Sequence, residues 1–381
     1  MALNERPLEP QAQKAAEALD QQQPAHKRVD DPAIVEALDG LIAKMGGDPN
    51  DAKMRLVRDM MQTSLRLVND NRDVGEMKLM VNSYKEMRYA YKVFGKYKKP
   101  HKITIFGSAR TPEGHPDFTA CVDFSKLMAD AGWMAITGAG MGIMKAGHVG
   151  PGRAASFGVS IRLPFETNAN DIIAGDEKLI HFRYFFTRKL MFVSQAEAVA
   201  LFPGGFGTLD EAYETLTLVQ TGRSTPLPIV CVEGKGGDYW TTWHAWAKEQ
   251  LLRRGWISPE DTGLYYIAKD PADAVAHVLK FYKNYHSSRY VKDEFVIRLK
   301  KPLHDYDVQR LEHEYAVLIK QGGMVQRGPV EGEEDNLDLP RLVFTHTKHK
   351  FGILRRLIDR INDLTPSDDG WTPPQLANHH A

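Results

Sequence analysis

Apolar runs of two kinds alternate through the middle of the chain, and this alternation predicts a layered α/β fold. Short runs typical of buried strands are separated by longer stretches with helical spacing. The predicted strands cover residues 103–106, 133–137, 157–163, 198–202, 227–232 and 264–267. The predicted helices cover residues 118–131, 184–195, 212–220, 239–254 and 272–282. Such alternation favours a doubly wound parallel sheet with helices on both faces.

The flanking segments follow other patterns. Methionine and aromatic residues recur at helical spacing in 56–68 and 77–94, as in a helical core or interface. Beyond residue 283, predicted strands 294–299 and 342–347 and helices 306–320 and 353–361 indicate a small α+β domain. The predicted organisation is a disordered N-terminus (1–30), a helical N-terminal segment (31–99), the α/β domain (100–283), the C-terminal α+β domain (284–364) and a disordered tail (365–381).

Composition narrows the class of protein. Lys+Arg and Asp+Glu both number 49, so net charge gives no reason to expect a nucleic-acid partner. Cys121 and Cys231 stand far apart, without a disulfide framework or zinc spacing. His115, His148 and His181 lack metal spacing and are interpreted as ordinary residues. With no signal peptide and no run long enough to span a bilayer, we expect a cytoplasmic protein without metal, cofactor or membrane partner.

Three glycine-rich turns each follow a predicted strand. They begin at Gly107, Gly138 and Pro203. Because the carboxyl ends of parallel strands share one edge of the sheet, these turns should converge there. Backbone N–H groups at a glycine turn before a helix bind anions. The sequence therefore predicts a phosphate site that comprises Gly107, Ser108, Gly138, Gly140, Gly142, Gly204, Gly205, Gly207 and Thr208.

The turn from Gly138 to Gly142 has two other interpretations. A dinucleotide fingerprint places its third glycine three residues after the second and an acidic residue at the end of the next strand. Here the third glycine comes too early, and the next strand ends Ile161-Arg162-Leu163-Pro164 without an acid. A purely structural tight turn remains the other alternative.

Glu211 and Arg188 are the candidate catalytic residues. Thr208 and Glu211 have the spacing of a capping box, which would satisfy backbone donors without any catalytic role. The glycines before Thr208 are unnecessary for a cap, however, and Asp210 and Glu214 crowd Glu211, which favours acid–base chemistry. Arg188, with Lys189 beside it, is either a solvated cation or a clamp for phosphate or a sugar oxygen.

Arg188-Lys189 followed by Pro203-Gly204-Gly205-Phe206-Gly207-Thr208-Leu209-Asp210-Glu211 resembles the RK…PGGxGTxxE signature of the LOG (LONELY GUY) family. The resemblance covers about residues 100–283 and implies a Rossmann-like fold. It also implies hydrolysis of the N-glycosidic bond of nucleoside 5′-monophosphates, either AMP and other purine nucleotides or cytokinin riboside 5′-monophosphates. By the same resemblance Glu211 and Arg188 are the catalytic pair, Lys189 and the glycine turns bind phosphate, and the protein is a homodimer or larger homo-oligomer.

Two features separate the chain from the short members of that family. It has Phe185-Phe186-Thr187 before Arg188, where the short forms have Met-His-x, and it carries extra segments at both ends. Both features indicate that the chain resembles the longer, nucleotidase-like relatives more than the members specific for cytokinin precursors.

Two other functions remain open at this stage. The basic residues Lys348, Lys350, Arg355 and Arg356 would suit a nucleotide-binding regulatory protein with little catalysis, or simply a solvated helix face. The older label of lysine decarboxylase would require a lysine in a Schiff base with pyridoxal phosphate, and Lys189 is the motif's only lysine.

Overall fold

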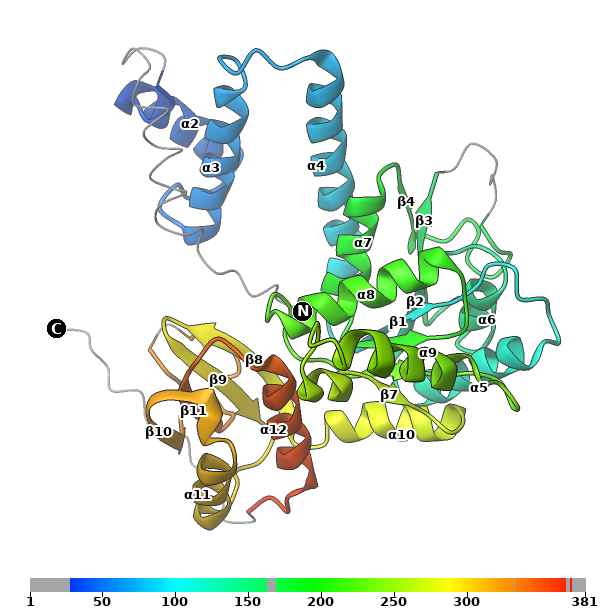
Figure 1. The fold of residues 1–381 in the computed structure, drawn as a ribbon. Helices are drawn as coiled ribbons and strands as arrows, with labels where there is room; N and C mark the ends of the chain where they lie inside the picture. The colour runs from blue at the N-terminus through cyan, green and yellow to red at the C-terminus, as the bar shows by residue number, and fades with distance from the viewer. Residues whose placement is uncertain (1–27, 163–168, 332, 368–370, 372–381) are drawn as a thin grey trace. The chain divides into compact units, whose positions relative to one another are not determined.

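A computed structural model of the chain describes residues 28–162, 169–331, 333–367 and 371. Most of the two termini predicted to be disordered lies outside these residues. The chain divides into two compact units, one up to Lys85 and the other from Glu86 onward. The division falls inside helix α4 (Val74–Phe94) (Figure 1).

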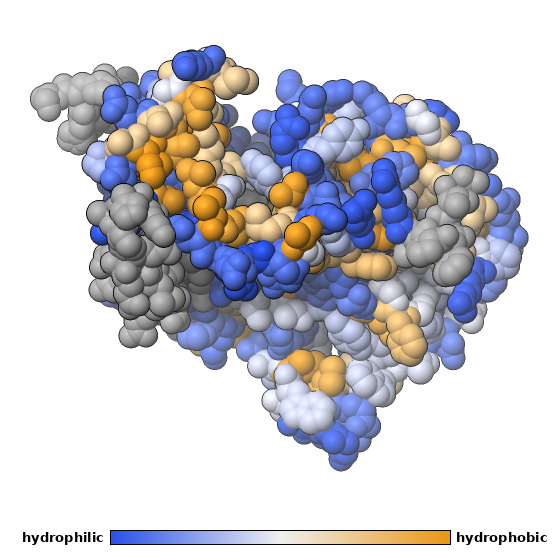
Figure 2. Space-filling view, turned by 90° about the horizontal axis from the view of Figure 1, so that it is seen from above, coloured by the Kyte–Doolittle hydropathy of each residue, from blue (hydrophilic) through white to orange (hydrophobic). Residues whose placement is uncertain are grey.

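The first unit contains α2 (Pro32–Lys44), α3 (Ala52–Arg66) and the start of α4. Asp31 and Asp51 cap α2 and α3, since their carboxylates accept backbone N–H groups of the first turn. No residue of α3 is buried, and its apolar residues Leu56 and Met60 are exposed. Exposed apolar side chains of this kind form the orange groups in Figure 2. The apolar stripe predicted over 56–68 is therefore not a core within the described residues, and its use as an interface stays a prediction. The stripe predicted over 77–94 does enter a core, because Val93 and Phe94 of α4 are buried.

The second unit is built on a parallel sheet of seven strands in the order β4-β3-β2-β1-β5-β6-β7. The α/β Rossmann-like fold predicted from the sequence is thus confirmed. The strands are β1 (Lys102–Phe106), β2 (Met134–Thr137), β3 (Ser156–Ile161), β4 (Leu179–Phe182), β5 (Ala198–Leu201), β6 (Ile229–Cys231) and β7 (Tyr266–Ile267). The sequence did not predict the edge strand β4.

Helices cover both faces of this sheet. Their bounds are α5 (Pro116–Asp130), α6 (Ile143–Val149), α7 (Phe185–Ser194), α8 (Phe206–Gln220), α9 (Tyr239–Ala247) and α10 (Pro271–Phe281). Side chains of α5, α6 and α10 share one buried core, and those of α4, α7, α8 and α9 share the core on the other face. Single-turn 3₁₀ or π segments occur at Gly95–Tyr97, Lys248–Leu252, Pro259–Gly263 and Ala316–Leu318.

The C-terminal domain is an antiparallel sheet in the order β10-β11-β9-β8. Its elements are β8 (Tyr285–Val291), β9 (Glu294–Leu299), α11 (Asp305–Glu314), β10 (Ile319–Arg327), β11 (Arg341–His346) and α12 (Phe351–Asp363). The helix predicted over 306–320 ends at Glu314, and the sequence missed β8 and β10. The core of this domain is continuous with that of α5 and α10.

The basic cluster of the C-terminal domain is not one solvated face. Arg355 is buried, lies 4.4 Å from the ring centroid of Phe281, and pairs with Asp359. Arg355 therefore belongs to the packing between α10 and α12. Among the described residues, no helix is both long enough and apolar enough to cross a membrane.

Candidate active site

The three glycine turns meet at one edge of the parallel sheet. The strand order reverses between β1 and β5, and ligands of open α/β sheets bind beyond the carboxyl ends of the strands at such a point. The turns after β1 and β5 are joined there, because the N–H of Ser108 donates to the carbonyl of Pro203 at 3.1 Å. The turn after β2 joins them through Ile143, whose N–H donates to the carbonyl of Ser108 at 3.0 Å.

Several of the glycines are required by close approach. A Cβ at Gly107 would collide with Ile143, one at Gly138 with the guanidinium of Arg188, and one at Gly142 with the carbonyl oxygen of Ser108. Gly142 also has φ 62° and ψ −132°, a conformation reserved for glycine. These contacts explain the glycines as packing requirements, and their part in phosphate binding stays a prediction.

We expect Gly142→Ala to lower the free energy of unfolding by about 3 kcal/mol or more, because the added methyl group is strained and also strikes the Ser108 carbonyl. Gly152→Ala is the matched control. Gly152 has φ 68° but no atom within 4 Å of its would-be Cβ, so the strain acts alone there. Urea unfolding of both variants measures the difference, and an equal loss of stability in the two would contradict the packing argument.

The turn after β5 presents bare backbone to solvent. Nothing lies within 4 Å of a Cβ built at Gly205 or Gly207, so a ligand can approach the chain there. The hydroxyl of Tyr239 donates to the carbonyl of Gly204 at 2.7 Å and holds the turn against α9. Gly205 is the N-cap of α8, which has no side-chain cap. The capping box that the sequence allowed for Thr208 and Glu211 is therefore not formed.

Glu211 lies in the first turns of α8 with only 8% of its surface exposed. Its Oε2 is buried and has no hydrogen-bond partner among the described residues. Burial raises the pKa of Glu211 to about 7, against the opposing charges of Lys189 and Arg188, while Glu214 and Asp210 add smaller upward contributions. Crowding by Glu214 and Asp210 is thus a lesser cause of the raised pKa of Glu211 than burial.

Arg188 extends from α7 beneath the turn after β2. Its Nε donates to the carbonyl of Val159 in β3 at 2.8 Å, and its guanidinium carbon lies 5.0 Å from the ring centroid of Phe192. The same guanidinium lies against Gly138 and contributes to the field at Glu211. The structure therefore brings the two candidate catalytic residues to the same edge of the sheet.

Lys189 is engaged with carboxylates. Its Nζ lies 2.7 Å from Asp210 and 3.0 Å from Glu214. Burial opposes its charge, but these two ion pairs raise the pKa of Lys189 above its ordinary value. Lys189 links α7 to α8 beside Glu211. Its predicted contact with phosphate would require one of these two ion pairs to break.

Two polar residues that the sequence did not single out hold the turn after β2. The side-chain amide of Asn170 donates to the carbonyls of Ala139 and Gly140 at 3.1 and 2.9 Å. The buried ring of His148 bonds Thr137 at 2.9 Å and also contacts Asn170. These bonds stabilise Ala139 at φ 65°, an unusual value for a residue with a side chain. No motif in the sequence marks either residue, because the contacts join separate segments.

His115 and His181 belong to other elements of the fold. The ring of His115 caps α5, and His181 lies in the edge strand β4. Burial lowers the pKa of His148, which favours the neutral imidazole.

Residues 140–278 match a family model described as possible lysine decarboxylase, the family also known as LOG. The matched segment contains both Arg188 and Glu211, so the resemblance stated from the sequence is confirmed for this part of the chain. A search of curated proteins found no match.

Three solved structures are each similar to roughly half of this chain. The molybdenum cofactor carrier protein from Chlamydomonas reinhardtii is 19% identical over 48% of this chain and 98% of its own, with a TM-score of 0.35. The molybdenum cofactor binding protein from the phototrophic bacterium Rippkaea orientalis is 17% identical over 48% and 96%, with a TM-score of 0.34. DNA processing protein A from Helicobacter pylori is 12% identical over 50% and 83%, with a TM-score of 0.35.

Proposed function

We propose that this protein hydrolyses the N-glycosidic bond of nucleoside 5′-monophosphates and releases the free base and ribose 5-phosphate. The observation that carries the proposal is Glu211, a buried carboxyl group with an unpartnered oxygen and a pKa raised to about 7. It lies beside an arginine and a set of glycine turns at the switch point of the sheet. The match of residues 140–278 to the LOG family supports the same assignment.

The proposed mechanism uses the carboxylate of Glu211 at C1′ of the ribose. Cleavage of the C1′–N bond develops positive charge on the sugar ring, which a nearby carboxylate stabilises. Glu211 also activates water, whose oxygen forms the new bond to C1′ while a proton goes to the departing base. Arg188 orients the ribose or phosphate, and the glycine turns bind the phosphate, so that binding energy remote from the reacting bond positions the sugar.

The substrate is tested with AMP, GMP and a cytokinin riboside 5′-monophosphate, each incubated with the purified protein. Chromatography should find free base and ribose 5-phosphate in equal amounts from at least one of them. AMP is the expected preference, because the extra segments and Phe185-Phe186-Thr187 set the chain apart from the short LOG proteins. Absence of base release from all three over several hours would refute the proposed activity.

The pH profile of kcat/KM tests the role of Glu211. If the ionised carboxylate is the active form, kcat/KM rises tenfold for each pH unit below about 7 and levels off above it, because this parameter reports the free enzyme. A profile that is flat between pH 5 and 8 would contradict a catalytic carboxylate with this pKa.

Lysine decarboxylation fits the site poorly. A Schiff base forms from a neutral amine, but Lys189 is paired with Asp210 and Glu214, and its pKa lies above the ordinary value. Lys189 is therefore better suited to structural pairing than to holding pyridoxal phosphate.

A further inference from the structure

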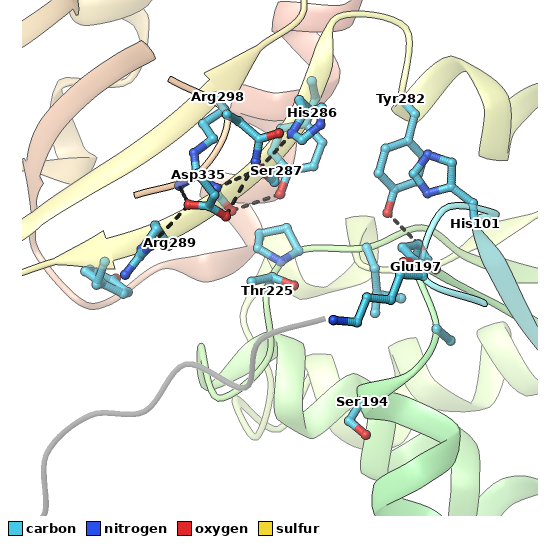
Figure 3. Close-up of a pocket in the computed structure, with 18 of the residues that line it drawn as sticks. His101, Ser194, Glu197, Thr225, Tyr282, His286, Ser287, Arg289, Arg298 and Asp335 are labelled. Carbon is cyan, nitrogen blue, oxygen red and sulfur yellow. Dashed lines mark hydrogen bonds and ion pairs between the residues drawn. The ribbon is translucent and has the colours of Figure 1, made fainter. Parts of the chain in front are cut away.

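A pocket of about 1010 Å³ lies between the two sheets of the second unit (Figure 3). One wall is the amino-terminal edge of the parallel sheet, with His101 just before β1, Glu197 just before β5 and Leu227 before β6. The other wall is the C-terminal sheet, with residues 285–290 and Arg298. The pocket therefore lies at the opposite end of the strands from Glu211 and is separate from the candidate active site.

The C-terminal wall carries excess positive charge. The buried carboxylate of Glu333 is bound by two buried guanidiniums, Arg298 at 2.6 Å and Arg341 at 3.0 Å. Asp335 pairs with Arg298 at 2.7 Å but reaches Arg289 only at 3.7 Å. Three guanidiniums thus share two carboxylates, and of these five groups Arg289, Arg298 and Asp335 line the pocket. The long, half-exposed contact of Arg289 contributes little stability, so this guanidinium can turn to a bound anion at small cost.

Aromatic rings line the space beside these charges. Tyr91, Tyr285 and Tyr290 contribute phenol rings, and His101 and His286 contribute imidazoles. Burial lowers the pKa of both histidines, so their rings are neutral at pH 7. Lys98 adds an ammonium to the lining. A cavity whose lining combines several aromatic faces with cations fits a ligand that combines a planar ring with negative charge.

We propose that this pocket binds a small anion that carries an aromatic ring, of the chemical class of a nucleotide, as an effector distinct from the substrate. Arg289 and Lys98 would contact the anionic group, and the tyrosine and histidine rings would hold the planar part. The inference of a binding site depends on the pocket alone, whereas the inferred effect on catalysis rests on the proposed function.

The helices that carry the candidate catalytic residues connect the two sites. Helix α7 holds Arg188 near its start, and Ser194, its last residue, lines the pocket. Helix α8 holds Glu211 near its start, and the loop after it reaches the pocket at Thr225. A ligand that contacts both Ser194 and Thr225 can shift α7 relative to α8. Such a shift would change the distance between Arg188 and Glu211.

Calorimetric titration of full-length Glu211→Gln with ADP tests the binding site without turnover. We expect ADP binding that Arg289→Ala, added to this variant, weakens by about tenfold or more, because a charge-assisted contact to phosphate is lost. Adenosine and inorganic pyrophosphate are the two partial probes, and each should bind more weakly than ADP. Arg327→Ala is the matched control, since Arg327 is a comparably exposed arginine of the same sheet that pairs with Glu294 away from the pocket. It should leave ADP binding unchanged.

The binding results decide the site. No ADP binding up to about 1 mM, equal affinity in the Arg289→Ala variant, or an equal loss in Arg327→Ala would each overturn it. Adenosine or pyrophosphate binding as tightly as ADP would overturn the ligand class. Circular dichroism establishes that the variants are folded.

The effector role is tested separately by base release from AMP with Glu211 intact. ADP should change kcat/KM by about fivefold or more, and Arg289→Ala should remove that change while leaving the rate without ADP near wild type. An ADP effect that persists in Arg289→Ala would assign ADP to the active site and overturn the effector role. If no nucleotide releases base, the proposed function fails, and the calorimetric result still decides the binding site.

Discussion

Replacing Glu211 by glutamine is expected to lower kcat for base release by about 10²–10⁴-fold, the range typical of losing a positioned acid–base group. Glutamine keeps the size of the side chain but can neither ionise nor stabilise charge at C1′. The rate is measured as base released from the best nucleoside 5′-monophosphate under saturating conditions.

Asp210→Asn is the matched control for this substitution. Asp210 precedes Glu211 and also pairs with Lys189, but 60% of its side chain is exposed. Its loss should change kcat by no more than about threefold, because exposed ion pairs contribute little. Near-wild-type turnover in Glu211→Gln, or an equal loss of kcat in Asp210→Asn, would contradict the proposed catalytic role of Glu211.

The same Glu211→Gln substitution is expected to stabilise the folded protein at pH 8 by about 3 kcal/mol. The folded-state pKa of about 7 lies above the ordinary value of 4.5. Between these two values the folded chain keeps the proton that the unfolded chain releases. The stability of the wild type therefore falls as pH rises through this interval. Glutamine resembles the protonated form at every pH, so the variant avoids that loss.

Urea unfolding at pH 4.5 and pH 8 measures this gain. The variant and wild type should be similar at pH 4.5, and the variant should be the more stable at pH 8. Asp210→Asn is again the control, because 60% of the Asp210 side chain is exposed. A Glu211→Gln variant that is less stable than the wild type at pH 8 would contradict the burial argument.

The parallel sheet could be predicted because its central strands are continuous apolar runs that end in glycine turns. The strands that were missed lack this signal. β4 is a four-residue edge strand that contains His181, and β10 contains Gly322 and Gly323. β8 has four consecutive polar residues, 286–289. Edge strands need only one buried face, so their composition resembles that of a loop. The helix predicted over 306–320 was too long because Val317-Leu318-Ile319 continues its apolar spacing into a strand.

The candidate site was predictable in its motifs but not in its environment. The spacing of Thr208 and Glu211 allowed a capping box, and only the position of Gly205 as the N-cap decided against it. The burial of Glu211, the bonds of Asn170 and His148, and the pocket beside Arg289 all depend on contacts between distant segments. A single sequence without its fold carries no local signal for such contacts.

The shared core between α10 and the C-terminal domain bears on how this protein can vary in evolution. Val278 and Phe281 of α10 are buried in one apolar cluster with Leu354 and Ile358 of α12. A descendant that lost the C-terminal domain would expose these residues and would need polar replacements on α10 to remain soluble. The C-terminal domain and the parallel-sheet domain are therefore expected to be inherited together. In a relative without the C-terminal domain, polar residues are expected at these positions of α10.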